Sequence, residues 1–241
     1  FHIFHKFFTI KIFKKSTDIV LLKMVNKKLS VLIIGLISLV LLSSFISAWE
    51  IKKTEVSQLA IRDVNMPAIF NLEITNNGAT DNFNVYSVAG VEIEPKEKFE
   101  IKAGETKNVL IKIFPTVPLK VSPDYYSFEY KLKGEKTGTQ TDELVITLVK
   151  LSDAFNLYAE DINPDSDTAR VHLQSRYGDA LENLTLDVSS SFFSIKESFS
   201  LAAMEDKVFE IPLDEAKVRV LLAGPYIING KISFNDVTSS I

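Results

Sequence analysis

Most of the chain after Trp49 alternates apolar and polar residues with a period of two. In the stretch FNLEI, Phe70, Leu72 and Ile74 are apolar and the residues between them are polar. Because successive side chains of a strand point to opposite faces of a sheet, this pattern predicts strands with one buried face. The same alternation recurs in four more segments, Phe83–Val85, Val109–Ile113, Tyr126–Leu132 and Leu144–Leu148. The chain after Trp49 is therefore predicted to be all-β.

Turn-forming residues separate these segments at short intervals. Connections this short leave no room for crossover helices, so the strands are expected to pair antiparallel and to form sandwiches of two sheets, as in immunoglobulin-like domains. The turns are predicted at Asn76-Asn77-Gly78, Glu94-Pro95-Lys96, Ala103-Gly104-Glu105, Ser122-Pro123-Asp124 and Lys133-Gly134-Glu135.

The second half of this region repeats the first at a spacing of 100 residues. Identical residues recur at this spacing, as Phe99 does in Phe199, and the apolar positions before each turn recur with them. Self-similarity at a fixed period is typical of tandem copies of one structural unit. We predict two tandem immunoglobulin-like antiparallel β-sandwiches, one over residues 50–151 and one over residues 152–241.

The repeat predicts that the second unit lacks its last strand. In the first unit this strand covers Thr139–Lys150, and its counterpart would cover about residues 239–250, whereas the sequence stops at Ile241. An open sheet edge invites pairing with another chain. Two alternatives follow: the sequence is a fragment, or a partner protein donates the strand.

A hydrophobic segment precedes the β region. Leu29–Ala48 holds 20 residues without a charge and follows Lys23, Lys27 and Lys28. A helix of this length spans about 30 Å, the thickness of a membrane's hydrocarbon core. We predict an N-terminal hydrophobic helix within residues 24–48 that contacts the membrane.

This helix has two alternative fates. It is either a cleaved signal peptide, for which Ala48 is a suitable last residue, or a retained transmembrane anchor. Both place the β-sandwiches outside the cytoplasm, membrane-anchored or secreted, and a retained anchor would put Trp49 at the membrane interface. Residues 1–23 precede the first methionine, Met24, and are expected to be an extension that does not belong to the native protein.

Charge and composition exclude several functions. The whole chain has 27 Lys and Arg and 31 Asp and Glu; residues 1–48 hold seven Lys and one Asp, which leaves 20 basic and 30 acidic residues, a net charge of −10, for residues 49–241. An acidic exterior repels phosphate backbones, so we expect no nucleic-acid partner. The chain has no Cys and three His, so no zinc site, disulfide or other cofactor site is predicted.

The first unit resembles a known family. The stretches FNLEITNNGATDNFNVYSV, FEIKAGETKNVLIKIFP and SPDYYSFEYKL are similar to the Ig-like accessory domain named for its association with alpha-galactosidases, and to adhesion-type domains of archaeal and bacterial surface proteins. The resemblance implies a non-catalytic module and carries over no binding residues. The first unit lacks a Trp in its third strand, and the second has Met204 in place of the turn glycine. The matching residues are Asn76, Gly78, Gly104, Glu105, Thr106 and Tyr126.

Few residues suggest chemistry. His172 is the only histidine after residue 48, and its place on a strand between Val171 and Leu173 points it to solvent, so no catalytic residue is predicted. Asp161, Asp165 and Asp167 could bind Ca²⁺ near the junction of the units, but a solvated turn is the favoured interpretation.

Two further features concern the surface. Alternation should bury Tyr126 and Tyr130 and leave Tyr125 as a single exposed ring, a weak platform for sugar stacking. Asn183 begins the sequon Asn-Leu-Thr and is predicted to be a glycosylation acceptor that faces outward.

The sequence thus favours a non-enzymatic structural or adhesion module of the cell surface, with a surface protein or a glycan as its partner. Two alternatives stay open. One is a carbohydrate-binding accessory region of a larger glycan-active enzyme, and the other is an export or assembly factor that accepts a strand from another protein.

Overall fold

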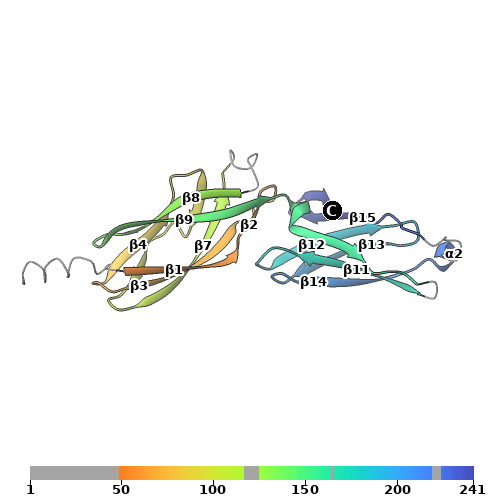
Figure 1. Cartoon of the computed structure of the whole chain (residues 1–241), viewed down its shortest axis with the longest axis horizontal. Helices are drawn as coiled ribbons and strands as arrows, with labels where there is room; N and C mark the ends of the chain where they lie inside the picture. The colour runs from red at the N-terminus through yellow and green to blue at the C-terminus, as the bar shows by residue number, and fades with distance from the viewer. Residues whose placement is uncertain (1–48, 117–124, 164–165, 219–223) are drawn as a thin grey trace, which may run out of the picture. The chain divides into compact units, whose positions relative to one another are not determined.

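The computed structural model describes residues 49–116, 125–163, 166–218 and 224–241 (Figure 1). Within these ranges, no helix is long and apolar enough to cross a membrane. The predicted membrane helix Leu29–Ala48 and the expected extension 1–23 lie outside the described residues. The described chain consists mainly of strands, and the all-β prediction is confirmed.

Two sheets form the first half of the β region. The first sheet consists of β1 (Trp49–Ser57), β3 (Ala68–Asn76), β7 (Thr106–Pro115) and β5 (Val91–Glu94), in that order. The second consists, in order, of β2 (Leu59–Ile61), β9 (Gly138–Val149), β8 (Tyr125–Gly134), β4 (Asp81–Tyr86) and β6 (Phe99–Ile101).

One strand pair differs from the antiparallel prediction. β2 pairs with β9 in parallel, with Leu59 opposite Thr147 and Ile61 opposite Val149. The prediction rested on short connections, which join strands that are close in sequence. β2 and β9 are distant in sequence, because the chain leaves β1 at the edge of one sheet and continues in β2 at the edge of the other.

The buried faces of these two sheets share one core. Phe70, Leu72 and Ile74, whose alternation predicted a half-buried strand, are all essentially inaccessible to solvent. Trp49 belongs to the same core: it is 3% exposed and packs edge-on against Phe83, with ring centroids 5.7 Å apart. Its expected position at a membrane interface is therefore wrong, because β1 begins at Trp49 and the indole is inserted between the sheets.

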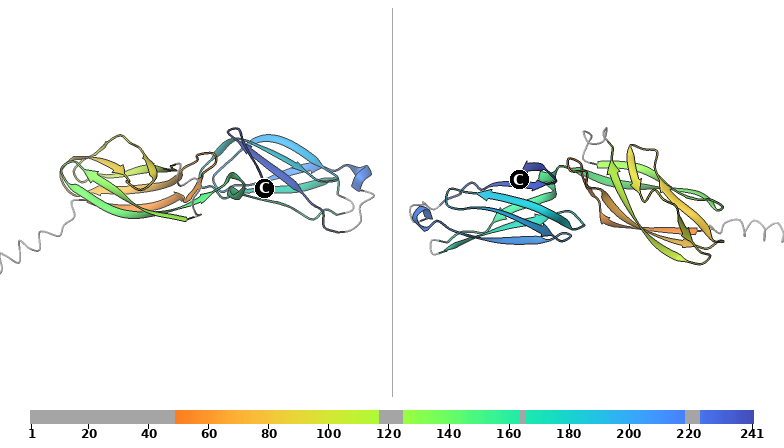
Figure 2. Two further views of the ribbon diagram at one scale, coloured as in Figure 1. Left: turned by 90° about the horizontal axis from the view of Figure 1, so that it is seen from above. Right: turned by 180° about the vertical axis from the view of Figure 1, so that it is seen from behind.

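The second half repeats this strand order in a smaller form. A short 3-10 helix, η2 (Leu151–Ala154), leads to a sheet of β10 (Phe155–Ala159), β11 (Thr168–Ser175) and β14 (Asp206–Pro212), in order. The opposite sheet consists, in order, of β13 (Ser194–Leu201), β12 (Leu181–Ser189), β15 (Asn229–Phe234) and β16 (Val237–Ser240). The four-residue helix α2 (Glu215–Val218) follows β14, and Figure 2 shows the two layers of each half from two further sides.

The turn before β7 and the turn before β14 confirm the 100-residue spacing. In the first, the amide of Lys102 donates to the Glu105 carboxylate at 2.7 Å, and in the second, the amide of Ala202 donates to Glu205 at 2.6 Å. Gly104 has φ +73° and Met204 has φ +56°, so the methionine adopts the left-handed conformation that glycine adopts in the first unit. The absence of glycine in the second unit has therefore not changed the turn.

The conserved spacing also explains two repeated side-chain pairs. The Lys107 ammonium lies 5.8 Å from the ring centroid of Phe99, and the Lys207 ammonium lies 5.8 Å from that of Phe199. A cation over an aromatic face is attracted by the ring quadrupole. The identities between the two halves thus preserve a contact as well as a strand pattern.

The last strands of the two units differ in length. β9 has 12 residues, and the strand in the same place in the second unit, β16, has four, pairing Lys231 to Phe234 of β15 with Ser240 to Val237. The second unit therefore contains a short strand at the position where the sequence predicted a missing one. β15 begins at Asn229, and the Ser190 hydroxyl donates to the Ile227 carbonyl just before it, at 3.1 Å.

A buried carboxylate fixes the turn between β8 and β9 to β4. Asp81 is 2% exposed, and its Oδ2 accepts hydrogen bonds from the amides of Lys136 and Thr137, each at 3.0 Å, and from the Thr137 hydroxyl at 2.8 Å. Burial alone would raise the pKa of Asp81, but these hydrogen bonds, together with one from the Asn82 amide, hold it below its usual value. A Cβ on Gly134 would overlap Thr137 and lie 2.6 Å from Asp81 Oδ2, so only glycine fits there.

Candidate functional sites

A buried hydrogen bond joins the two units. The hydroxyl of Tyr177 donates to the carbonyl oxygen of Pro67 at 2.7 Å, and Tyr177 is 0% exposed. Burial raises the pKa of this hydroxyl, and the nearby charge of Asp179 adds to the effect. The tyrosine therefore stays neutral and serves as a donor. Sequence reasoning missed this residue, because its partner is 110 residues away.

Gly178 allows the backbones of the two units to approach closely. A Cβ at this position would overlap the carbonyl oxygen of Val56 and lie 2.9 Å from the Cβ of Ser57. The Gly178 amide donates to the Ser57 hydroxyl at 3.1 Å. The turn glycine of the sequence repeat thus has a second role in the second unit, at the contact with β1.

Apolar and charged side chains complete this junction. Ile61 and Ile69 of the first unit are buried in the same cluster as the core of the second unit, together with Leu151. The Asp63 carboxylate accepts the amide of Leu151 at 2.9 Å and 3.0 Å through its two oxygens. The connector η2 is therefore held by the hydrogen bonds from Leu151 to Asp63 and by a shared hydrophobic core.

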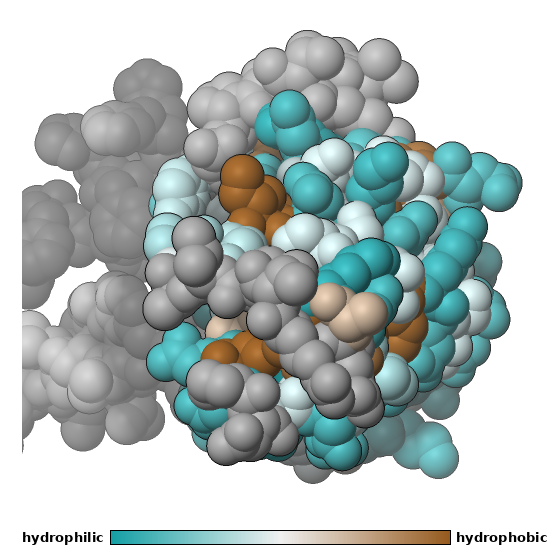
Figure 3. All heavy atoms as spheres, turned by 90° about the vertical axis from the view of Figure 1, so that its right-hand side faces the viewer, coloured by the Kyte–Doolittle hydropathy of each residue, from teal (hydrophilic) through white to brown (hydrophobic). Residues whose placement is uncertain are grey.

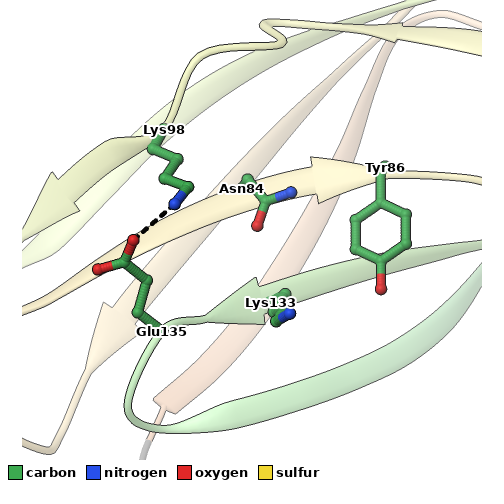
Figure 4. A pocket seen from close by; sticks show the side chains of 5 residues that line it. All are labelled: Asn84, Tyr86, Lys98, Lys133 and Glu135. Atoms are coloured by element: carbon green, nitrogen blue, oxygen red, sulfur yellow. Dashed lines mark hydrogen bonds and ion pairs between the residues drawn. The ribbon is translucent and has the colours of Figure 1, made fainter.

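A second candidate site is a polar hollow on the outer face of the sheet that contains β4 and β8. It has a volume of about 450 Å³ and is lined by Asn84, Tyr86, Lys98, Lys133 and Glu135 (Figure 4). Asn84 and Tyr86 are two residues apart on β4 and so lie on one face, and Asn84 is directly opposite Lys133 on β8. We call these five residues the polar hollow.

An ion pair forms one end of the polar hollow. Lys98 Nζ lies 2.6 Å from Glu135 Oε1, and the Asn82 amide nitrogen donates to Glu135 Oε2 at 3.3 Å. The hydrogen bond from Lys98, followed by that from Asn82, lowers the pKa of Glu135 below its usual value. Glu135 thus stays ionised and neutralises Lys98, which leaves the charge of Lys133 unbalanced within the hollow.

His172 lies in a third polar cluster, on the outer face of the sheet formed by β10, β11 and β14. Its Nε2 is 2.9 Å from Glu160 Oε1 and its Nδ1 is 3.2 Å from Asp206 Oδ2. Tyr158 covers the ring and donates its hydroxyl to Asp206 at 3.1 Å, while Arg170 pairs with Glu160 at 2.8 Å. The side chain is 12% exposed, so it points away from the core, as predicted, but is covered by neighbours rather than by solvent.

The two carboxylates favour the charged form of His172. Both ring nitrogens face acceptors, and only the imidazolium can donate from both. The hydrogen bond to Glu160, together with that to Asp206, raises the pKa of His172 above its usual value, against a smaller opposing effect of burial. The arrangement suits a structural ion cluster and offers no nucleophile to which the imidazole could act as base.

The remaining predicted residues do not come together. Asn183 is exposed, with φ +58° at a register shift between β12 and β13, and its glycosylation stays a prediction. Asp161 and Asp167 are exposed and Asp165 lies outside the described residues. Across the described ranges, no group of three or more His, Asp or Glu could hold a metal ion.

The three predicted tyrosines are distributed as alternation requires. Tyr130 is 0% exposed, Tyr126 is partly buried against the core, and Tyr125 is 72% exposed.

Figure 3 shows one face of the molecule, on which hydrophilic residues cover most of the coloured surface and hydrophobic residues gather in small patches.

No protein-family model matches the chain, and no curated protein matches it. Among solved structures, the chain is similar to a FixG-related protein from Vibrio parahaemolyticus, at 13% identity and a TM-score of 0.35, over 43% of this chain and 98% of that chain. The E. coli chaperone DraB is 10% identical with a TM-score of 0.32, over 76% of this chain and 90% of that one. The Pseudomonas aeruginosa chaperone CupB2 is 6% identical with a TM-score of 0.26, over 79% of this chain and 98% of that one.

Proposed function

We propose that residues 49–241 are a non-enzymatic structural and adhesion module of the cell surface. The observation that carries this proposal is the buried hydrogen bond from Tyr177 to Pro67, at 2.7 Å, within a junction that also shares a hydrophobic core. Tandem domains joined only by a linker move relative to each other by default. A locked junction instead fixes the loops of the second unit relative to the first unit. A module that presents these loops to a partner requires such fixed positions.

The proposal includes an immunoglobulin-like fold for each unit. The order β1-β3-β7-β5 facing β9-β8-β4 corresponds to the ABED and GFC sheets of such domains. The resemblance to the alpha-galactosidase-associated accessory domain and to surface adhesion domains involves Asn76 and Gly104, and the Gly104 amide donates to the Asn76 carbonyl at 2.7 Å. These residues shape a turn, in keeping with a module without catalytic residues.

The proposed location is outside the cytoplasm, membrane-anchored or secreted. It is supported by the uncharged stretch Leu29–Ala48 and the lysines before it.

Spin labels can test whether the junction is locked. The chain has no Cys, so Lys102→Cys and Lys196→Cys, both exposed and one in each unit, introduce a single labelled pair. Electron–electron distance measurements should give one narrow distribution. Gly178→Ala should broaden it, because the new Cβ overlaps Val56, whereas Gly224→Ala, with open space around its Cβ, should not. A distribution equally broad in all three proteins would contradict a rigid presentation module.

A specific observation supports a second candidate function, acceptance of a strand. The second unit has the four-residue β16 where the first has the 12-residue β9, and Ile227, just before β15, is 80% exposed. In the first unit, the same stretch of β8 pairs with β9 up to Tyr125 opposite Thr147. A peptide strand that pairs along β15 beyond the end of β16 would gain backbone hydrogen bonds.

A peptide with the sequence Thr139–Lys150 is a suitable probe. It should raise the melting temperature of residues 49–241, and a peptide with Pro at alternate positions should not, because proline cannot donate to a ladder. An identical effect of the two peptides would exclude strand addition.

A further inference from the structure

We propose that the polar hollow binds a carboxylate-bearing saccharide, such as a uronic acid residue within a polysaccharide. This inference deepens the proposed adhesion role by naming a ligand class. It rests on residues of β4 and β8, on Glu135 just after β8 and on Lys98 in the loop before β6, all within the first unit and away from Tyr177. Its failure would therefore leave the spin-label test of the rigid module unaffected.

The charges of the polar hollow match one carboxylate. Glu135 neutralises Lys98 at 2.6 Å, and in the described part of the chain Lys133 has no ion-pair partner. The lining thus carries a net charge of +1, from two lysines and one glutamate. A phosphate group has a charge of about −1.5 to −2 at neutral pH, and its three acceptor oxygens each need a hydrogen-bond donor. A single ammonium beside a glutamate suits the smaller charge of a carboxylate.

The remaining groups suit sugar hydroxyls. The Asn84 side chain has no hydrogen-bond partner in the described structure, and an amide offers both a donor and an acceptor. Tyr86, on the same face of β4, adds a hydroxyl and a half-buried ring that can cover an apolar sugar face. Figure 4 shows Asn84 between the Lys98–Glu135 pair and Tyr86, so the polar groups follow one line along the hollow.

The dimensions favour a unit of a chain over an enclosed small molecule. A volume of about 450 Å³ lies within the usual range of ligand sites, roughly 300–1,000 Å³. Lys98, Lys133 and Glu135 are all exposed, so the hollow opens to solvent along its length. An open hollow lets a polysaccharide continue beyond the bound residue. Because residues 49–241 carry a net charge of −10, the hollow is a local exception in an acidic surface.

The test is a titration of residues 49–241, which contain both cores in full, with trigalacturonate. Amide NMR shifts should change on β4 and on the Lys133–Glu135 segment. The methyl ester of trigalacturonate is the matched ligand, since it keeps the sugar and removes the charge. The affinity of the ester should be lower by a factor of about ten or more, as expected for the loss of a charge-assisted hydrogen bond.

Two variants locate the binding. Lys133→Met keeps the apolar stem but removes the ammonium, and should weaken trigalacturonate binding about tenfold or more. Lys196→Met, an exposed lysine of the second unit, should leave affinity unchanged and controls for net charge. The proposal is overturned if millimolar trigalacturonate changes no amide shift, or if the acid and the ester bind equally well. It is also overturned if the two variants have equal effects, or if galactose 6-phosphate binds more tightly than galacturonate.

Discussion

The imidazole ring of His172 stacks on the phenol ring of Tyr158, with ring centroids 4.6 Å apart and an angle of 10° between the planes. Two strands meet in this contact, because Tyr158 belongs to β10 and His172 to β11. Asp206 on β14 binds both rings, through the Tyr158 hydroxyl and His172 Nδ1. The outer face of this sheet is therefore held together by a cluster whose charge depends on the protonation of His172.

The stability of the second unit is expected to fall as the pH rises through the folded-state pKa of His172. The hydrogen bond to Glu160, and then that to Asp206, raises this pKa above 6.5, so the contribution of the ion pairs is complete below about pH 6.5. The pKa of Glu160 is lowered, first by His172, from 4.5, so its contribution is complete above that value and is lost in acid. Stabilisation by the cluster should thus be greatest between these two values.

Thermal unfolding from about pH 5 to pH 9 checks this expectation. The His172→Gln variant should lose the decrease on the alkaline side. Because His172 is the only histidine of residues 49–241, its NMR titration gives the folded-state pKa without ambiguity. A midpoint at or below the value of an exposed histidine would contradict the proposed origin of the effect.

The sequence placed His172 correctly on an outward strand position but could not show its partners. Alternation determines which face a side chain is on, and Val171 and Leu173 define that face locally. The carboxylates come from beyond β10 and from β14, and their positions depend on the pairing register, in which Val208 lies opposite His172. The polar hollow was missed for the same reason, since it combines residues of β4 and β8 with loop residues.

Tyr177→Phe should lower the free energy of unfolding by about 1–3 kcal/mol, the cost of leaving a buried polar group without its partner. The group concerned is the Pro67 carbonyl, which would lose its 2.7 Å donor. Urea unfolding can be followed through Trp49, the only tryptophan, which is buried in the first unit. Tyr125→Phe, at a ring that is 72% exposed, is the control and should stay within about 0.5 kcal/mol of the parent protein.

Asp81→Asn should destabilise the first unit by about 1–3 kcal/mol, because an amide nitrogen would face donors that now bind a carboxylate oxygen. These donors are the Lys136 and Thr137 amides. The lowered pKa of Asp81 also predicts that this stabilisation is present above about 3.8 and is lost as the pH falls through the folded-state pKa. Asp187→Asn, at an exposed position of β12, should have little effect on urea or acid unfolding.

Met204→Gly should stabilise the second unit by about 0.5–1 kcal/mol. A left-handed conformation costs a residue with a Cβ about 1–2 kcal/mol, and the greater flexibility of glycine in the unfolded chain offsets part of the gain. The reverse change, Gly104→Ala, should destabilise the first unit by about 1 kcal/mol, because φ is +73° there. Ala203→Gly is a control next to Met204, and stabilisation by this change too would show that φ is not the cause.

The fold was predictable where it depends on local pattern and unpredictable where it depends on distant contacts. The alternation at Phe70, Leu72 and Ile74 predicted a buried face that the structure confirms. The parallel pairing of Leu59 with Thr147 and the contact of Tyr177 with Pro67 left no local pattern. The predicted position of Trp49 was wrong for a related reason. Its place after an apolar stretch suits a membrane interface, whereas its burial depends on contact with Phe83, which is distant in sequence.

The hairpin glycine of the first unit bears on how tandem repeats avoid exchanging strands while they fold. Neighbouring repeats can misassemble by inserting a segment of one into the other. Phe234, paired with Val237, stands in the second unit where Gly134, paired with Gly138, stands in the first. Even a Cβ at Gly134 would lie 2.6 Å from Asp81 Oδ2, so the hairpin of the second unit cannot replace that of the first. A side chain at this one position is therefore incompatible with the first unit's sandwich.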